Sequence, residues 1–232
     1  MPRALLIHGL SSSPAALWRL RQSLEGAGWI TEAIAMRGHG GQPPARDYAL
    51  PSYASDLAST GPWDLVVAHS LGASAATLVA AADPGWTARL VLLEPVWRIP
   101  AEDEPAIIAD QREELELTRS QLEAAKPNWD PRDVDAKLEA IARVDPEAVT
   151  RTFTDTGRWD ITDAAASLSM PTLVLAGDPD VYSMLDPADA VAVTERAAPF
   201  VDYRVVHGVG HSPHLDAPDQ TQELLLTWLE SQ

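Results

Sequence analysis

The sequence predicts an α/β fold in which helices cover a doubly wound, mostly parallel sheet of about six strands. The first observation is a set of short runs rich in Val, Leu and Ile, at residues 4–7, 65–68, 90–93, 172–176 and 203–206. Near-continuous apolar runs of this length are typical of strands covered on both faces. A sixth, less continuous run at 29–35 is expected at one edge of the sheet. The second observation is helical periodicity between the runs, and right-handed crossovers then place helices on both faces.

Amphipathic helices are expected at both ends of the chain. After Pro14, three leucines at positions 17, 20 and 24 fall on one helical face. Proline suits the first turn of a helix, and Gly26 and Gly28 stand near its expected end. The last fifteen residues, "PDQTQELLLTWLESQ", have the same periodicity and close the chain as a helix.

Residues 98–163 break the alternation of strand and helix. They have helical periodicity but no convincing strand, and they hold 17 acidic and 9 basic residues, nearly half of the net negative charge. We interpret this segment as a helical cap inserted into a core formed by residues 1–97 and 164–232. The alternative is a set of ordinary crossover helices.

Composition excludes several classes of protein. The formal net charge of −17 argues against nucleic-acid binding, which needs clustered Lys and Arg. The chain has no Cys, hence no disulfide, thiolate nucleophile or thiolate metal site. No stretch approaches the roughly 20 apolar residues that span a bilayer, and the apolar run after Met1 is too short for a signal peptide. We expect a cytoplasmic protein that does not associate with membranes; protein partners are not predicted.

The stretch "VVAHSLGAS", residues 66–74, joins a buried strand to a helix through a lone hydroxyl, that of Ser70. A nucleophile in such a strand-to-helix turn needs small neighbours, because the two backbones nearly touch; the usual pattern is G-x-S-x-G. Here it reads Ala68-His69-Ser70-Leu71-Gly72. A simple helix N-cap serine is the alternative.

Two later loops carry the partners that a serine nucleophile requires. A serine hydroxyl needs a base, and the base needs a carboxylate to hold its tautomer. The loop "GDPD" follows the run at 172–176, and "HGVGHSPH" follows the run at 203–206. Both loops come at the carboxyl ends of predicted strands, where open α/β sheets place their sites. The helical spacing of His207, His211 and His214 is not a metal face, because the intervening Gly and Pro residues disfavour a helix.

The stretch "LLIHGLSSS" is the candidate oxyanion loop. An oxyanion needs two fixed N–H donors, one from the residue after the nucleophile and one from a loop after an early strand. Leu71 and Leu10 occupy these positions. A plain turn at His8-Gly9 is the alternative for this stretch alone.

Together, "HGLSSS", "RGHGG", "AHSLGAS", "GDPDV" and "GVGHSPHLDAPD" resemble the α/β-hydrolase superfamily, in family order across nearly the whole sheet domain. The resemblance implies a Ser-His-acid hydrolase with Ser70 as nucleophile, His211 as base and Asp180 as acid. Asp178 and Glu94 are the alternatives for the acid. Two departures stand out: Ala68 replaces the usual first glycine, and the first two strands of larger members are missing.

We therefore expect a serine hydrolase that cleaves a small carboxylic ester without cofactor or metal, with Leu10 and Leu71 as oxyanion donors. Trp97, Trp159 and Tyr182 are candidates for the substrate pocket. One alternative keeps the triad for lactone, amide, thioester or C–C bonds, and another is a ligand receptor with little turnover. Hydroxynitrile lyases place a lysine beside the triad, but nothing in the sequence brings Lys126 or Lys137 near Ser70.

Overall fold

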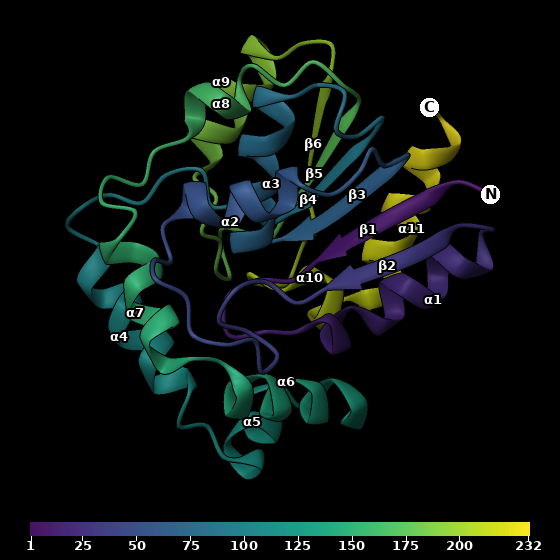
Figure 1. Ribbon diagram of the computed structural model, residues 1–232. Helices are drawn as coiled ribbons and strands as arrows, with labels where there is room; N and C mark the ends of the chain where they lie inside the picture. Colours follow the sequence, from purple (N-terminus) through teal and green to yellow (C-terminus); the bar gives the residue numbers. More distant parts are fainter.

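A computed structural model describes all 232 residues and contains one sheet of six parallel strands. The strands are β1 (Arg3–Ile7), β2 (Ile30–Ile34), β3 (Leu65–His69), β4 (Leu90–Leu93), β5 (Thr172–Ala176) and β6 (Val201–Val205). Their order is β2-β1-β3-β4-β5-β6 (Figure 1), which confirms the predicted fold class and the edge position of the second strand. The sixth strand begins at Val201, two residues before the predicted run.

Alternate residues of the inner strands face opposite sides of the sheet, as the two-residue period of a strand requires. In β1, Leu5 and Ile7 join the larger hydrophobic cluster, whereas Ala4 and Leu6 join the smaller one. β3, β4 and β5 divide in the same way. Both faces are therefore covered, and this explains the near-continuous apolar runs in the sequence.

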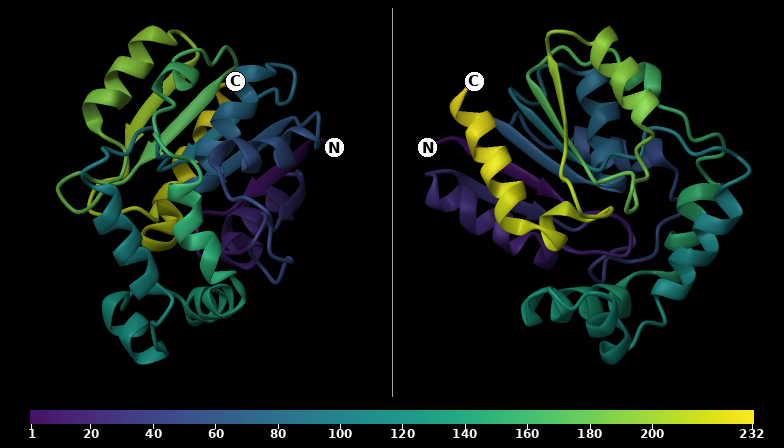
Figure 2. Two further views of the ribbon diagram at one scale, coloured as in Figure 1. Left: turned by 60° about the vertical axis from the view of Figure 1, so that its left-hand side comes forward. Right: turned by 180° about the vertical axis from the view of Figure 1, so that it is seen from behind.

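Helices cover the two faces of the sheet in separate layers (Figures 1 and 2). One face carries α1 (Trp18–Gly26), preceded by a 3₁₀ turn at Pro14–Leu17, and the C-terminal α11 (Pro218–Glu230). The other face carries α2 (Leu50–Ala58), α3 (Leu71–Ala82), α8 (Thr162–Ala165) and α9 (Pro187–Arg196). A short helix, α10 (Pro213–Asp216), leads into α11.

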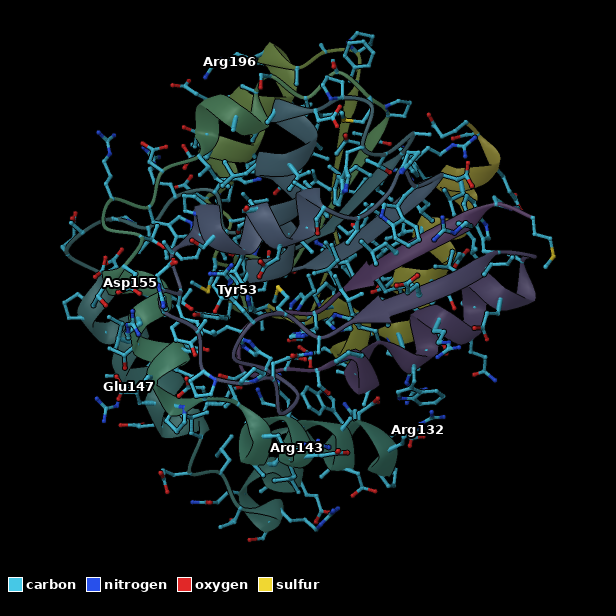
Figure 3. All side chains as sticks on the ribbon, in the orientation of Figure 1. Tyr53, Arg132, Arg143, Glu147, Asp155 and Arg196 are labelled. Atoms are coloured by element: carbon cyan, nitrogen blue, oxygen red, sulfur yellow. The ribbon has the colours of Figure 1, made fainter.

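Four consecutive helices between β4 and β5 lie outside these layers, beyond the carboxyl ends of the strands (Figure 1). We call them the cap helices: α4 (Glu104–Glu114), α5 (Arg119–Ala125), α6 (Pro131–Arg143) and α7 (Pro146–Thr154). Both α6 and α7 begin with an Asp-Pro pair, in which the aspartate side chain accepts a backbone N–H of the first turn. α6 and α7 carry charged residues along their length, among them Arg132, Arg143 and Glu147, and Asp155 directly follows α7 (Figure 3).

The two segments that connect the cap helices to the sheet domain pair with each other. The amide of Ile161 donates to the carbonyl of Trp97 at 2.7 Å, and the amide of Ile99 donates to the carbonyl of Trp159 at 2.9 Å. Arg98 and Asp160 form an antiparallel bridge between these two bonds. The cap helices thus leave and rejoin the sheet domain at one place. None of the helices combines the length and apolarity needed to cross a bilayer.

The strand order reverses direction between β1 and β3, because β2 lies on one side of β1 and all later strands lie on the other. Loops at the carboxyl ends of strands part at such a switch point and leave a crevice, which is where open α/β sheets bind ligands. The loop after β1 and the turn after β3 flank this crevice. They contain Leu10 and Ser70.

Candidate active site

Ser70 lies in a strained turn between β3 and α3. Its backbone dihedrals are φ 51° and ψ −118°, a region that L-residues rarely adopt. The turn requires close backbone contact: a Cβ atom at Gly72 would lie 2.4 Å from the carbonyl oxygen of His8. The small residue predicted after the serine is therefore a steric necessity. Strain held in place by packing is typical of a nucleophile elbow.

His211 reaches Ser70 from the loop after β6. Its Nε2 lies 2.8 Å from the Ser70 Oγ, as the sequence led us to expect. The loop packs tightly on the neighbouring one, since a Cβ atom at Gly177 would lie 2.5 Å from the carbonyl oxygen of Gly210. His69 holds the same loop in place, because its Nε2–H donates to the carbonyl of His211 at 2.8 Å.

Glu94, at the end of β4, is the carboxylate that contacts His211. Its Oε2 lies 2.8 Å from the His211 Nδ1 and accepts the amide of Met184 at 3.0 Å. Its Oε1 accepts the amide of Gly177 and the hydroxyl of Ser183, both at 2.7 Å. The side chain is fully buried, and burial raises its pKa. The hydrogen bonds from His211, Ser183 and Gly177 outweigh this effect and lower the pKa of Glu94 below its ordinary value.

The expectation that Asp180 contacts His211 is corrected, since Glu94 holds this position. Asp180 is exposed, and its backbone N–H donates to the side chain of Asp178 at 3.0 Å. Asp178 in turn accepts the amide of Gly208 at 2.9 Å, and these two N–H donors lower its pKa. The two aspartates therefore shape the loop after β5 and leave the imidazole to Glu94.

A signal for Glu94 is present in the sequence. It follows the apolar run "RLVLL" directly and precedes a proline, so its side chain starts at the end of a buried strand. A glutamate is almost never fully buried unless it is paired. In the structure, the backbone of Glu94 has a positive φ of 48°, which among residues other than glycine occurs elsewhere only at Ser11 and Ser70. The chain order serine, acid, histidine holds equally for Glu94 and Asp180, so order alone does not separate them.

The loop after β1 runs alongside Ser70. A Cβ atom at Gly9 would lie 3.0 Å from the Ser70 Cβ, so a larger residue would crowd the hydroxyl. The backbone N–H groups of Leu10 and Leu71 donate to no acceptor within the protein. Two amides in the loops that flank Ser70 are thus free to bind a ligand atom.

Two buried histidines hold the same loop in place. The His8 Nδ1–H donates to the carbonyl of Gly9 at 2.8 Å, and its Nε2 accepts the amide of Met36 at 3.1 Å. The His39 Nε2 accepts the amide of Ser11 at 3.2 Å. An acceptor nitrogen carries no proton, so both rings are neutral in these contacts. Burial lowers the pKa of His8 to about 3 and that of His39 to about 4, which agrees with neutral rings.

A cavity of about 510 Å³ lies between Ser70 and the cap helices. Half of its 34 lining residues are hydrophobic, a composition typical of small-molecule sites. Leu10, Leu71, Trp159 and Tyr182 line it, as expected from the sequence.

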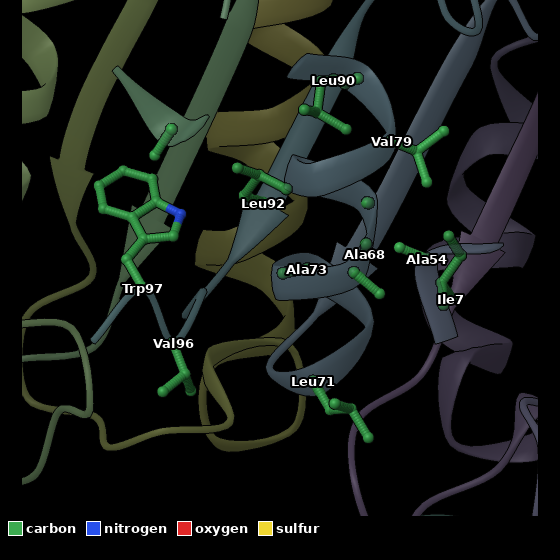
Figure 4. Packing of buried hydrophobic residues seen from close by; sticks show 14 of the residues in the cluster. Ile7, Ala54, Ala68, Leu71, Ala73, Val79, Leu90, Leu92, Val96 and Trp97 are labelled. Atoms are coloured by element: carbon green, nitrogen blue, oxygen red, sulfur yellow. The ribbon is translucent and has the colours of Figure 1, made fainter. Parts of the chain in front are cut away.

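Trp97 does not line the cavity, and this expectation is corrected. Its side chain is 1% exposed and belongs to the larger core cluster, which also contains Leu92 and Val96 (Figure 4). Lys126 and Lys137 depart from expectation in the opposite sense, because both line the cavity that contains Ser70. The sequence does not predict the position of these two lysines, because the packing of the cap helices decides which of their side chains face the cavity.

Comparison with known proteins identifies relatives at the level of family and fold. Residues 4–224 match the family described as the alpha/beta hydrolase family. No curated protein sequence matches the chain.

Among solved structures, the chain is similar to E-2-(acetamidomethylene)succinate hydrolase, with a TM-score of 0.81, 22% identity, and coverage of 99% of this chain and 91% of that one. It is also similar to a thermophilic esterase from Thermogutta terrifontis with malate bound (TM-score 0.74, 22% identity, coverage of 100% and 90%). An esterase from Exiguobacterium antarcticum matches with a TM-score of 0.78 and 16% identity, over 99% and 92% of the two chains. At these identities the likeness is one of fold.

Proposed function

The chain belongs to the alpha/beta hydrolase family, and from this membership and the site geometry we propose that it is a serine hydrolase. The reaction proposed is cleavage of a small carboxylic ester through an acyl-enzyme intermediate. The observation that carries the proposal is one continuous chain of hydrogen bonds. The Ser70 Oγ lies 2.8 Å from the His211 Nε2, and the His211 Nδ1 lies 2.8 Å from the Glu94 Oε2.

The Glu94 carboxylate determines the direction of proton transfer. An ionised carboxylate accepts hydrogen bonds only, so it favours the imidazole tautomer that carries its proton on Nδ1. The Nε2 lone pair then faces the hydroxyl of Ser70 and accepts its proton as the Oγ attacks the carbonyl carbon. Because the pKa of Glu94 lies below its ordinary value, the carboxylate stays ionised at neutral pH and stabilises the imidazolium that forms.

The free amides of Leu10 and Leu71 are proposed to bind the oxyanion of the tetrahedral intermediate. The intermediate collapses when His211 returns its proton to the departing alcohol. Water then loses a proton to His211 and attacks the acyl carbon, and the second tetrahedral intermediate releases the acid as His211 returns that proton to the Ser70 Oγ. One oxyanion donor of this kind is typically worth about 10²–10³ in turnover.

Replacement of Ser70 tests the proposal. Ser70→Ala should abolish hydrolysis of short methyl and p-nitrophenyl esters while leaving the melting temperature and circular dichroism unchanged. A fluorophosphonate probe should label the wild-type protein at Ser70 and should not label the variant. Retained turnover in Ser70→Ala would assign the reaction to another group. A single burst of acylation without steady turnover in the wild type would instead support a ligand receptor.

A further inference from the structure

Lysine is confined to one place in this protein. The chain has a net charge of −17 and 17 basic residues, but only Lys126 and Lys137 are lysines. Both line the cavity above Ser70, and no arginine lines it. The two ammonium groups are thus the only permanently cationic side chains in reach of a ligand in this cavity.

Lys137 extends from α6 to the loop that is proposed to bind the oxyanion. Its Nζ donates to the carbonyl oxygen of Ser11 at 3.0 Å and pairs with the Glu114 Oε1 at 2.8 Å. Ser11 follows Leu10 directly in the chain. An ammonium group has three N–H donors, and these two partners leave one of them for a ligand.

The counter-ions of the two lysines differ in how firmly they are held. Asp216 is 13% exposed, pairs with Lys126 at 3.0 Å and also accepts the indole N–H of Trp129 at 2.8 Å. Glu114 is 30% exposed, and Lys137 is the one partner of its carboxylate. The Lys137 side chain is 12% exposed, and the Glu114 carboxylate, 30% exposed and without a second partner, can turn towards solvent when another anion pairs with Lys137. A ligand anion can therefore replace Glu114 beside Lys137 more readily than it can replace Asp216, which has a second partner in Trp129.

We propose that the acyl part of the substrate carries a carboxylate, which Lys137 binds in place of Glu114. This inference rests on the proposed ester hydrolysis at Ser70. A carboxylate that enters a partly apolar cavity needs a paired cation to offset the loss of its hydration. Lys137 meets this need next to the oxyanion loop, so it selects esters whose acid portion is itself a dicarboxylate.

A matched pair of substrates isolates this contact. Monomethyl succinate and methyl succinamate differ only in a carboxylate against a carboxamide, and the glutarate pair extends the chain by one methylene. The quantity measured is the ratio of kcat/KM for the acid over kcat/KM for the amide. We expect the wild-type protein to favour the acid by about tenfold or more for at least one chain length, as a hydrogen bond between charged groups allows.

Variants of the two lysines assign the preference to one residue. Lys137→Met should lower the ratio by about tenfold to a hundredfold, and Lys137→Arg should restore part of it. Lys126→Met tests the other cavity lysine, and because Asp216 already balances the Lys126 charge at 3.0 Å, the ratio should fall clearly less than in Lys137→Met. Any general loss of activity through the Ser11 contact cancels in the ratio.

The pair Glu114→Gln and Glu113→Gln gives a second, opposite readout. Both remove one negative charge from α4, but only Glu114 lines the cavity and contacts Lys137. Glu114→Gln should raise the ratio, whereas Glu113→Gln should leave it unchanged. A wild-type ratio near one, or a ratio unaffected by Lys137→Met, would overturn the inference. Turnover of the amide ester that is lost in Ser70→Ala would show that the proposed hydrolysis stands in that case.

Discussion

The Nδ1 of His211 lies 2.8 Å from the Oε2 of Glu94, a residue 117 positions earlier in the chain. Sheet order accounts for this contact. Glu94 directly follows β4, which lies between β3 and β5, and β3 leads to Ser70. Three further donors hold the carboxylate, from Gly177, Ser183 and Met184. The Glu94 carboxylate is thus held by the sheet and by the loop after β5 together.

Glu94→Gln should lower kcat by about 10⁴, the effect expected when a triad loses its carboxylate. The new NH₂ group either opposes the Nδ1–H of His211 or forces the imidazole into the tautomer that cannot accept the proton of Ser70. Turnover of a p-nitrophenyl ester measures the loss, and the melting temperature separates it from unfolding.

Asp180→Asn is the matched control for this prediction. Asp180 is exposed and its side chain does not contact His211, so kcat should stay within about threefold of the wild type. The opposite order of the two effects would return the role of the acid to Asp180.

The sequence predicted what depends on local pattern and chain order. Apolar runs and helical periodicity gave six strands and their covering helices, and the serine elbow and the histidine loop gave the Ser70–His211 contact. Glu94 and Asp180 satisfy the same chain order, and only the path of the loop after β5 separates them. Trp97 and Lys137 illustrate the same limit. Whether either side chain faces the cavity depends on the packing of the cap helices, and short-range pattern does not encode this packing.

Gly72→Ala should destabilise the protein by about 2 kcal/mol or more, because the added methyl group overlaps the carbonyl oxygen of His8. The strain falls on the elbow and the oxyanion loop at once, so kcat should fall in the fraction that still folds. Urea unfolding and ester turnover measure the two effects.

Gly26→Ala provides the comparison for Gly72→Ala. Gly26 ends α1, and nothing lies within 4 Å of the position that its Cβ would take. Alanine has the higher helix propensity, so this variant should be neutral or gain up to about 1 kcal/mol. Equal destabilisation at both positions would mean that close backbone contact is not what Gly72 provides.

Asp133→Ala should destabilise the protein by about 3 kcal/mol. Asp133 is buried on α6 and accepts the indole N–H of Trp18 at 2.6 Å and two N–H groups of Arg19 at 3.2 and 3.0 Å. Its loss leaves the indole N–H of Trp18 without a partner and leaves Arg19 only its longer ion pair with Asp130 at 3.5 Å.

Asp135→Ala controls for charge on the same helix. Its ion pair with Arg119 is exposed on both sides, so the free energy of unfolding should change by less than about 1 kcal/mol. If urea unfolding gave the two variants equal stability, α6 would not depend on the Asp133 contacts.

Stability should fall between pH 7 and pH 5.5 because the protein buries neutral histidines. Burial lowers the pKa of His8 to about 3 and the pKa values of His39 and His214 to about 4, against 6.5 in the unfolded chain. A lowered pKa gives stability that is present above pH 6.5 and is lost as the pH falls towards the folded value, because only the unfolded state takes up protons. Each such histidine should cost about 1 kcal/mol over this interval. Urea unfolding at the two pH values measures the sum, and His214→Gln should reduce the loss by about 1 kcal/mol. The side chain of His207 is 81% exposed, so His207→Gln serves as the comparison without loss of a buried ring. An equal reduction in both variants would contradict burial as the cause.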